Sequence, residues 1–345
     1  MKKLKVVSGL VVVLLVLIVI FWKTPLLIRG PGNLISLENT VQVNQQRDEQ
    51  GGKFYVTVVQ TRSATLWEIL TTVNDPFREV VNQETANNGL PTEASRLQQQ
   101  TAMNNSQNAA KKLALDLAGK KAELSYQGIF VLTAAKESGL QGKVATGDQI
   151  VTVDDYFFTH SSDLINYLQE REVGAEVILE IEREGTKKMV TGKVDLNEVT
   201  GRHSLGIQLL DRTTLTSDIP VEIELGAVGG PSAGLMFTLQ MYAMASNHDL
   251  RNGRDIAGTG AINLDGQVTR VGGIAEKVYS AANGKAKAFL VPDDEISEEF
   301  RHYFPDVQSN YQEALVAVKK LDTEMVIVPV KTVQEAIDWL VETGS

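Results

Sequence analysis

Cysteine is missing from this sequence: none of the 345 residues is a cysteine. A chain without thiols has no cysteine nucleophile, no disulfide and no thiolate ligand for zinc. The absence excludes thiol chemistry, and it is compatible with an exported protein that does not depend on disulfide formation.

Positive charge is scarce as well, because 33 lysines and arginines face 43 aspartates and glutamates and leave a net charge of -10. No basic stripe is available to neutralise phosphates, which argues against a nucleic-acid-binding surface. The pattern Gly-x4-Gly-Lys-Ser/Thr is also missing, so the chain has no P-loop ATPase. We therefore expect neither a nucleic acid nor a nucleotide as a partner.

Histidine is rare, and its positions do not form the His-Glu-x-x-His spacing of a zinc hydrolase. We expect no metal and no cofactor, and we treat a metal site or a Ser-His-Asp triad as the weaker alternative to histidines in loops. The histidines are His160, His203, His248 and His302.

One long apolar run stands at the start of the chain. Residues 6–22 carry no charge, and three lysines precede them. The run is apolar on all sides, unlike a soluble helix, and it is just long enough to span a bilayer. No small-x-small cleavage site follows Trp22. We predict that residues 1–30 are a cytoplasmic tip and a retained signal anchor, with the rest outside the cell; a cleaved signal peptide is the alternative.

Residues 31–120 combine strand and helix patterns. Aromatic and β-branched residues at 54–59 predict a strand, and residues 64–73 predict a short helix. The stretch from residue 91 to about residue 119 is rich in Gln, Asn, Ala and Leu, and it has no Gly or Pro between its ends. It predicts a long, partly exposed helix.

From residue 121 to residue 198 the chain changes to short strands and turns. A strand pattern begins at Gly128, a helix pattern begins near Ser161, and Glu184-Gly185 predicts a hairpin turn. These features, with "SGLQGKVATGDQIVTVDD" and "GAEVILEIEREGTKKMV", resemble a PDZ domain.

A PDZ domain binds an extended peptide as an added strand at its sheet edge and holds a carboxylate on backbone N–H groups. The resemblance implies that Gly128, Ile129 and Phe130 form the carboxylate loop. The segment Tyr126-Gln127-Gly128-Ile129 stands where such domains usually have Gly-Leu-Gly-Phe.

The strongest chemical signal is Ser232, within the motif "VGGPSAG" (residues 228–234) before an apolar helix pattern. Glycines and a proline at a helix start let the backbone turn tightly and leave N–H groups unpaired. A serine there can attack a carbonyl while backbone N–H groups hold the oxyanion. A plain helix cap after a glycine turn is the alternative.

A second motif, "VGGIAEKV" (residues 271–278), opens another helix pattern and carries Lys277 in its first turns. A lysine held against an apolar face loses hydration, which disfavours its charged form. Such a lysine can accept the proton of a serine hydroxyl. A solvent-exposed helical lysine is the alternative for this residue taken alone.

The motifs "GPSAG", "TG" (residues 259–260) and "GGIAEK" together resemble the proteolytic domain of Lon peptidases, with the serine-to-lysine spacing usual in that family. The resemblance implies that Ser232 is the nucleophile and Lys277 the general base. It also implies that Thr259 holds the lysine by a hydrogen bond. The N–H groups of Ser232 and Ala233 are the candidates for the oxyanion hole.

One position departs from the Lon pattern: Gly229 stands where cytoplasmic Lon enzymes usually carry an aspartate, and Glu224 is the substitute candidate. The order of anchor, PDZ and Lon-type segments resembles a bacterial family of membrane-bound PDZ/Lon-like peptidases. It is similar to the streptococcal type that trims secreted pheromone peptides. The resemblance also implies a homo-oligomer, because Lon-type domains often form rings.

We therefore predict an α+β chain with an N-terminal transmembrane helix, a PDZ domain at 121–198 and a Lon-type α/β domain at 199–345. Residues 31–120 should pack with the Lon-type domain, which makes the PDZ domain an insertion. The predicted function is an ATP-independent extracellular serine endopeptidase that cleaves exported peptides or flexible protein segments. A membrane quality-control protease and a non-catalytic PDZ adaptor are the alternatives. The expected partners are peptides or unfolded proteins, and the membrane through residues 6–22.

Overall fold

The computed structural model describes residues 2–198, 200–226 and 229–344. Val228 of the serine motif and residue 199, where the Lon-type domain was predicted to begin, lie outside these ranges. The helices are α1 (Lys2–Phe21), α2 (Leu66–Thr72), α3 (Gln83–Ala86), α4 (Thr92–Leu117), α5 (Ser161–Gln169), α6 (Gly234–Ser246), α7 (Ile274–Asn283), α8 (Glu298–Tyr303), α9 (Asn310–Val318) and α10 (Val333–Glu342).

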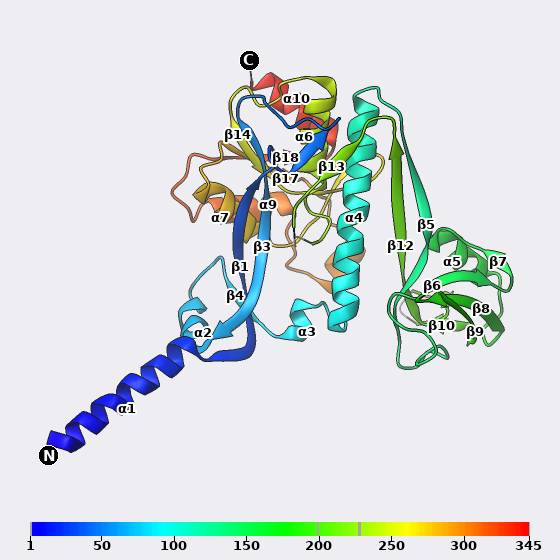
Figure 1. Cartoon of the computed structure of the whole chain (residues 1–345), viewed down its shortest axis with the longest axis horizontal. Helices are drawn as coiled ribbons and strands as arrows, with labels where there is room; N and C mark the ends of the chain where they lie inside the picture. The colour runs from blue at the N-terminus through cyan, green and yellow to red at the C-terminus, as the bar shows by residue number, and fades with distance from the viewer. Residues whose placement is uncertain (1, 199, 227–228, 345) are drawn as a thin grey trace.

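Strands and helices are interspersed along the chain, which is therefore a mixed α+β protein (Figure 1). They are β1 (Lys23–Ser36), β2 (Val41–Val43), β3 (Lys53–Thr65), β4 (Glu79–Val81), β5 (Ala122–Ala134), β6 (Gln149–Val153), β7 (Tyr156–Phe157), β8 (Glu176–Arg183), β9 (Thr186–Lys193), β10 (Asp195–Asn197), β11 (Arg202–Ser204), β12 (Ile207–Ser217), β13 (Val221–Ile223), β14 (Asp255–Gly258), β15 (Ala261–Ile262), β16 (Val268–Thr269), β17 (Ala288–Pro292) and β18 (Val326–Val330).

The larger unit is built on a six-stranded sheet in the order β18-β17-β14-β3-β1-β4. β18, β17, β14 and β3 run parallel to one another, whereas β1 lies antiparallel between β3 and β4. The pairing of β3 with β14 brings residues 53–56 beside residues 255–258. The N-terminal strands therefore complete a sheet whose other half lies in the C-terminal part of the chain.

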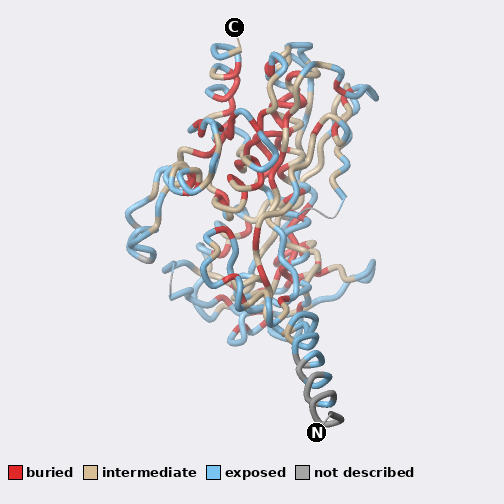
Figure 2. The backbone as a smooth tube through the Cα atoms, turned by 90° about the vertical axis from the view of Figure 1, so that its left-hand side faces the viewer, coloured by how far each residue is buried: buried red, intermediate tan, exposed pale blue. Residues whose placement is uncertain are grey.

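Helices cover both faces of this sheet because its strands alternate their buried side chains. Ile256 and Leu290 pack on one face in a core with residues of α4, α6 and α10. Ala257 and Phe289 pack on the opposite face with residues of α7 and α9. Figure 2 shows buried segments in the interior of the body and exposed ones along its surface. The sheet and its helices form the rigid frame on which the site is built.

The second unit is a β-rich sheet in the order β12-β5-β6-β8-β9, with β7 added on β6. The predicted hairpin turn is present between β8 and β9, where Glu184 and Gly185 both have positive φ, at 50° and 75°. That backbone matches the twist of the strands it joins. Helix α5 begins at Ser161 and buries Leu164 and Leu168 in the core of this unit. β12 adds residues beyond 198 to the same sheet.

Helix α4 lies between the two units (Figure 1). One side packs against α6. On the other side the Asn105 amide donates to Asp211 O at 2.8 Å and accepts from Thr213 N at 3.0 Å. A side-chain amide here makes the two hydrogen bonds that a peptide group of a neighbouring strand would make. Asn108 adds a bond to Thr213 O at 3.0 Å, so α4 joins the edge of β12 to the larger unit.

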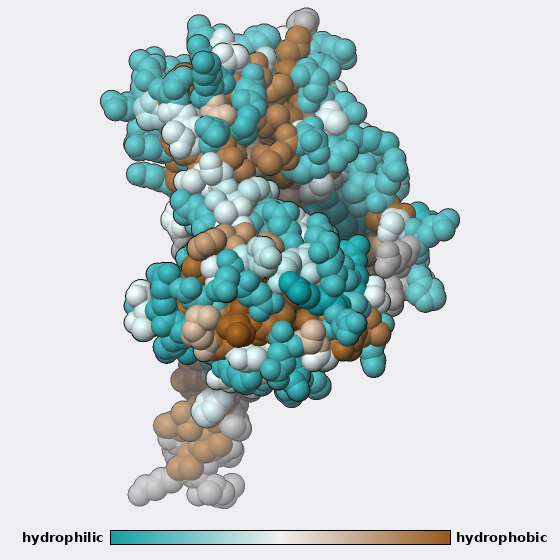
Figure 3. Space-filling view, turned by 90° about the vertical axis from the view of Figure 1, so that its right-hand side faces the viewer, coloured by the Kyte–Doolittle hydropathy of each residue, from teal (hydrophilic) through white to brown (hydrophobic). Residues whose placement is uncertain are grey.

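Helix α1 projects from the body as an apolar stem, while the face of the body seen beside it is largely hydrophilic (Figure 3). Its described side chains are mostly exposed, including Leu10, Leu14 and Phe21. Within the described part of the chain, none of the helices meets the length and apolarity needed to cross a bilayer.

Candidate active site

Ser232 lies at the start of α6, on a turn that only a flexible backbone can make. Gly230 has φ +88°, a backbone conformation that residues other than glycine rarely adopt. The helix that follows is mostly apolar and largely buried, with Leu235, Met236 and Phe237 in the core. This packing fixes the helix, and the half-buried Ser232 is held at its N-terminal end.

The backbone around Ser232 leaves two donors free. Within the described ranges, the N–H groups of Ser232 and Ala233 donate to no backbone carbonyl. The next N–H, of Gly234, donates to Pro231 O at 3.2 Å. The two predicted oxyanion donors are therefore adjacent, unpaired and at a helix start, where developing negative charge is favoured.

Lys277 lies one turn into α7, which begins after Gly273 at φ +73°. Its side chain is buried, with 3% exposed, and its Nζ donates to Thr259 Oγ1 at 3.0 Å. Burial lowers the pKa of Lys277 to about 8, and the Glu276 carboxylate opposes that shift. Such a lysine carries a substantial neutral fraction just above neutral pH and can then act as a base.

Thr259 connects the lysine to the serine segment. It is fully buried at the end of β14, and its hydroxyl donates to Ser232 O at 3.0 Å while accepting from Lys277. Gly260 N donates to the same carbonyl at 2.9 Å. The structure therefore brings together all three residues of the predicted Ser-Lys arrangement around one hydroxyl.

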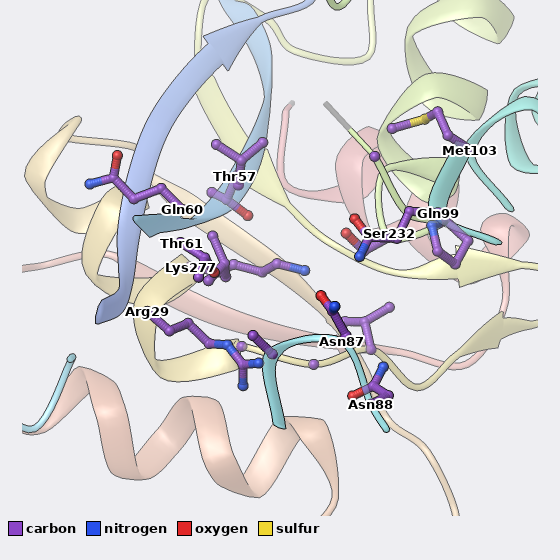
Figure 4. Close-up of a pocket in the computed structure, with 18 of the residues that line it drawn as sticks. Arg29, Thr57, Gln60, Thr61, Asn87, Asn88, Gln99, Met103, Ser232 and Lys277 are labelled. Atoms are coloured by element: carbon purple, nitrogen blue, oxygen red, sulfur yellow. The ribbon is translucent and has the colours of Figure 1, made fainter. Parts of the chain in front are cut away.

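Ser232 and Lys277 line one cavity of about 1090 Å³ (Figure 4). Figure 4 shows the Lys277 amine extending across the cavity toward the segment of Ser232. The other walls are Leu27, Arg29, residues 56–63, Gln83, residues 86–88, Gln99, Met103, Gly229, Pro231, Ala233 and residues 270–273.

Local sequence patterns mark few of these lining residues. Arg29 and the 56–63 segment come from β1 and β3, about two hundred positions before the serine, and no local pattern marks them as part of the site. Successive side chains of a strand point to opposite faces of the sheet. Because residues 56–63 all line the cavity, β3 borders it with its edge and not with one face. Beyond Val56, β3 has β1 on one side and no partner strand on the other within the described residues. An open strand edge thus runs along the cavity.

Gly229 stands at the position where the Lon pattern has an aspartate, and the space that the aspartate side chain would need is already occupied. A Cβ at this position would lie 3.3 Å from Gln99 Cβ and 3.4 Å from Gln99 Oε1. The Gln99 side chain of α4 therefore fills the space next to Gly229 and lines the cavity. Glu224, the substitute candidate, is exposed and does not line the cavity.

The prediction that Gly128, Ile129 and Phe130 form a peptide-binding loop is wrong. They lie inside β5, where Ile129 pairs with Asp211 of β12 on one side and with Ile150 of β6 on the other. A strand paired on both sides has no free N–H or C=O groups for a third. The outer strand is β12, and it follows a turn at Gly206 with φ +65°.

Comparison with known proteins matches residues 204–327 to the Lon protease (S16) C-terminal proteolytic domain. This range contains Ser232, Thr259 and Lys277. The chain is 30% identical over 127 residues to a Lon protease of Xanthomonas oryzae, covering 36% of this chain and 13% of that protein. It is 31% identical over 168 residues to a peroxisomal Lon protease homolog 2 of Caenorhabditis elegans, covering 46% and 20%.

The chain therefore spans only a small part of the length of these relatives. Among solved structures, it is similar to the PDZ domain of an SdrC-like protein from Listeria monocytogenes, with 22% identity and a TM-score of 0.24 over 26% of this chain and 93% of that one. The PDZ domain of an SdrC-like protein from Listeria innocua gives 23% identity and a TM-score of 0.23, covering 24% and 93%.

Proposed function

We propose that this chain, which carries a Lon-type proteolytic domain in residues 204–327, is a serine endopeptidase with Ser232 as nucleophile and Lys277 as general base. The observation that supports this most directly is the bridge through Thr259. One buried hydroxyl accepts from Lys277 Nζ at 3.0 Å and donates to Ser232 O at 3.0 Å. A base with a pKa of about 8 is thereby fixed beside the nucleophile's own backbone.

In the proposed reaction, the neutral Lys277 amine takes the proton of Ser232 Oγ as the oxygen attacks the scissile carbonyl. The developing oxyanion is held by the N–H groups of Ser232 and Ala233. Lys277 then passes its proton to the leaving amine as the C–N bond breaks, which leaves an acyl-enzyme. Water hydrolyses this ester with Lys277 again acting as base.

The substrate should be extended and unfolded. A peptide that runs along the open edge of β3, from Thr57 toward Ser63, would form backbone hydrogen bonds with that strand and pass Ser232 in the same cavity. A chain without a P-loop has no motor to unfold a substrate. We infer that the substrates are exported peptides, secreted signalling peptides among them, or flexible segments of exported proteins.

A peptide digest tests this proposal. The full chain, purified in detergent, is incubated with a mixed peptide library with and without Mg-ATP, and the products are read by mass spectrometry. We expect defined cuts at equal rates in both conditions and none with a Ser232→Ala preparation. Cleavage that requires ATP, or cuts that persist in the alanine variant, would contradict the proposal. Peptides bound but uncut would favour the adaptor.

We also propose that residues 6–22 anchor the chain in the cell membrane and that the catalytic part lies outside. Two observations support the anchor. The uncharged run carries exposed apolar side chains, and α2, which contacts α1, exposes an apolar face of its own. Trp67 is 53% exposed and Leu70 66%. Tryptophan beside an apolar helix suits the interface between lipid and water.

Cysteine-attached labels can test whether α1 and α2 lie in lipid, because the chain has no native cysteine that would also be labelled. Spin labels at Leu14→Cys (α1), Leu70→Cys (α2) and Val173→Cys (the exposed loop before β8) would be compared in the full chain in lipid bilayers. We expect the first two to be relaxed by oxygen, which enters lipid, and the third by a water-soluble nickel chelate.

The pattern of labels separates the two ideas. A lipid-exposed label at 14 with a water-exposed label at 70 keeps the anchor and refutes contact between α2 and the bilayer. Nickel accessibility at both positions, equal to that of the Val173→Cys control, would overturn the anchor itself.

A further inference from the structure

The two peptide groups around Ser232 are each fixed through their carbonyl oxygen. Pro231 O accepts a hydrogen bond from Ser106 Oγ at 2.9 Å and a longer one from Gly234 N at 3.2 Å. Ser232 O accepts from Thr259 Oγ1 at 3.0 Å and from Gly260 N at 2.9 Å. Each carbonyl therefore has a defined direction.

Fixing these carbonyls also fixes the two candidate oxyanion donors. The carbonyl of one residue and the N–H of the next belong to the same planar peptide group, and in a trans peptide they point in opposite directions. The direction of Pro231 O thus sets the direction of the Ser232 N–H. The direction of Ser232 O likewise sets that of the Ala233 N–H.

Thr259 and Gly260 belong to the Lon-type segment, whereas Ser106 does not. It lies on α4, 125 positions before Pro231, outside the residues matched to the Lon domain. Its side chain is buried, at 5% exposure. A second contact from α4 holds the same turn, because Gly230 N donates to Gln99 O at 3.1 Å.

The Ser106 hydroxyl is directed at the turn and not at its own helix. Serine and threonine within helices commonly bond the carbonyl four residues back, as Thr238 does to Gly234 O in α6 at 2.8 Å. Ser106 instead donates across the interface. The approach is close, since a Cβ at Gly234 would lie 2.9 Å from Ser106 Oγ.

We propose that Ser106 is a positioning residue for the oxyanion hole, which it serves by orienting the Ser232 N–H through the Pro231 carbonyl. The inference rests on the proposed peptidase function and names a device for it outside the Lon-type segment. Ser106 touches no substrate in this scheme. Without its bond the Pro231 carbonyl keeps only the longer hydrogen bond from Gly234 N at 3.2 Å, so the orientation of the Ser232 N–H toward the oxyanion is less restricted.

The test is Ser106→Ala in the full chain. Removal of a whole oxyanion donor costs about 10²–10³-fold in kcat, so loss of its orientation should cost less, about 10–100-fold. KM should stay within about threefold, because the oxyanion exists only in the transition state. A peptide boronate, which forms a tetrahedral adduct on the serine, should lose affinity by the same factor as kcat/KM.

Thr101→Ala is the matched control. Thr101 is an equally buried hydroxyl of α4, but it lines a different cavity, together with Gln127 and Arg212. This variant should keep the kcat and the boronate affinity of the wild type. Ser106→Cys keeps a weak donor at the same place and should fall between Ser106→Ala and the wild type. It also carries the test if the alanine variant does not fold.

The outcomes are distinct. A folded Ser106→Ala variant with wild-type kcat and boronate affinity would overturn the inference, and so would a change confined to KM. If the wild type itself cleaves nothing and forms no boronate adduct, the proposed peptidase function has failed, and the role of Ser106 fails with it.

Discussion

Ser232→Ala and Lys277→Met are each expected to lower kcat/KM by about 10⁴-fold or more. The alanine variant removes the attacking oxygen, and the methionine variant removes the base while keeping a side chain of similar length in the buried site. Because the two groups act in one proton transfer, the double variant should be no worse than either single one.

The measurement is peptide cleavage without ATP, with Ser162→Ala and Lys287→Met as controls. Both control residues are exposed and lie outside the cavity, so their variants should retain wild-type rates. Loss of activity in the controls would point to a general defect. Full activity in either dyad variant would refute the assignment.

Lys277 also makes the reaction depend on pH. Only the neutral amine can accept the serine proton, and burial lowers its pKa to about 8. We expect kcat/KM to rise about tenfold per pH unit below that value and to level off above it. A flat profile between pH 6.5 and 9 would mean that another group is the base.

The lowered pKa of Lys277 also makes the free energy of unfolding depend on pH. The folded chain binds this proton more weakly than the unfolded chain, whose lysine has a pKa of 10.5, so wild-type stability should increase as pH rises from about 8 to 10.5. At pH 7 the buried lysine is mostly charged, and burying this charge lowers the free energy of unfolding. Lys277→Met removes that cost, and its unfolding midpoint in urea should be no lower than that of the wild type.

Thr259→Val is expected to lower kcat/KM by about 10²–10³-fold, the range seen when a preorganised oxyanion group is lost. Valine has nearly the same shape but no hydroxyl. The change removes the acceptor of Lys277 Nζ and one of the two donors to Ser232 O, so it disturbs both the base and the Ala233 N–H.

Thr216→Val serves as the control, since Thr216 is an exposed strand residue outside the cavity. Thr259→Ser should recover much of the lost rate because it restores the hydroxyl. If Thr259→Val proves as active as the wild type, the threonine bridge has no catalytic role. A lower unfolding temperature with unchanged kcat would assign it to stability alone.

The parts of the fold that the sequence could predict are local ones. The turn at Glu184-Gly185, the start of α5 near Ser161 and the long α4 all depend on neighbouring residues, and the structure has them where the patterns placed them. The serine and lysine motifs are local in the same way. Glycines shape each backbone turn, and a helix follows each one: a mostly apolar helix after the serine motif and an amphipathic helix after the lysine motif.

The parts that could not be predicted depend on which strands meet. Gly128 and Ile129 looked like the start of an edge strand, but β12 pairs with β5 and turns that edge into an interior position. Likewise, nothing around Arg29 or Ser106 marks them as neighbours of Ser232. Register between distant segments is decided by burial across the whole sheet, and a local pattern contains no information on it.

The pairing of β3 with β14 also determines when the chain can become active. Thr57 and Gly258, hydrogen-bonded in the finished sheet, are 201 positions apart. At the usual synthesis rate of about 5–20 residues per second, the early strand waits about 10–40 s for its partner. The β-rich unit waits for less of the chain, because its most distant pairing joins Ala122 of β5 to Ser217 of β12, 217 − 122 = 95 positions apart. A chain still in synthesis therefore lacks both Lys277 and the β3–β14 pairing that fixes the β3 wall of the cavity. Any cleavage is delayed until the protein is nearly whole.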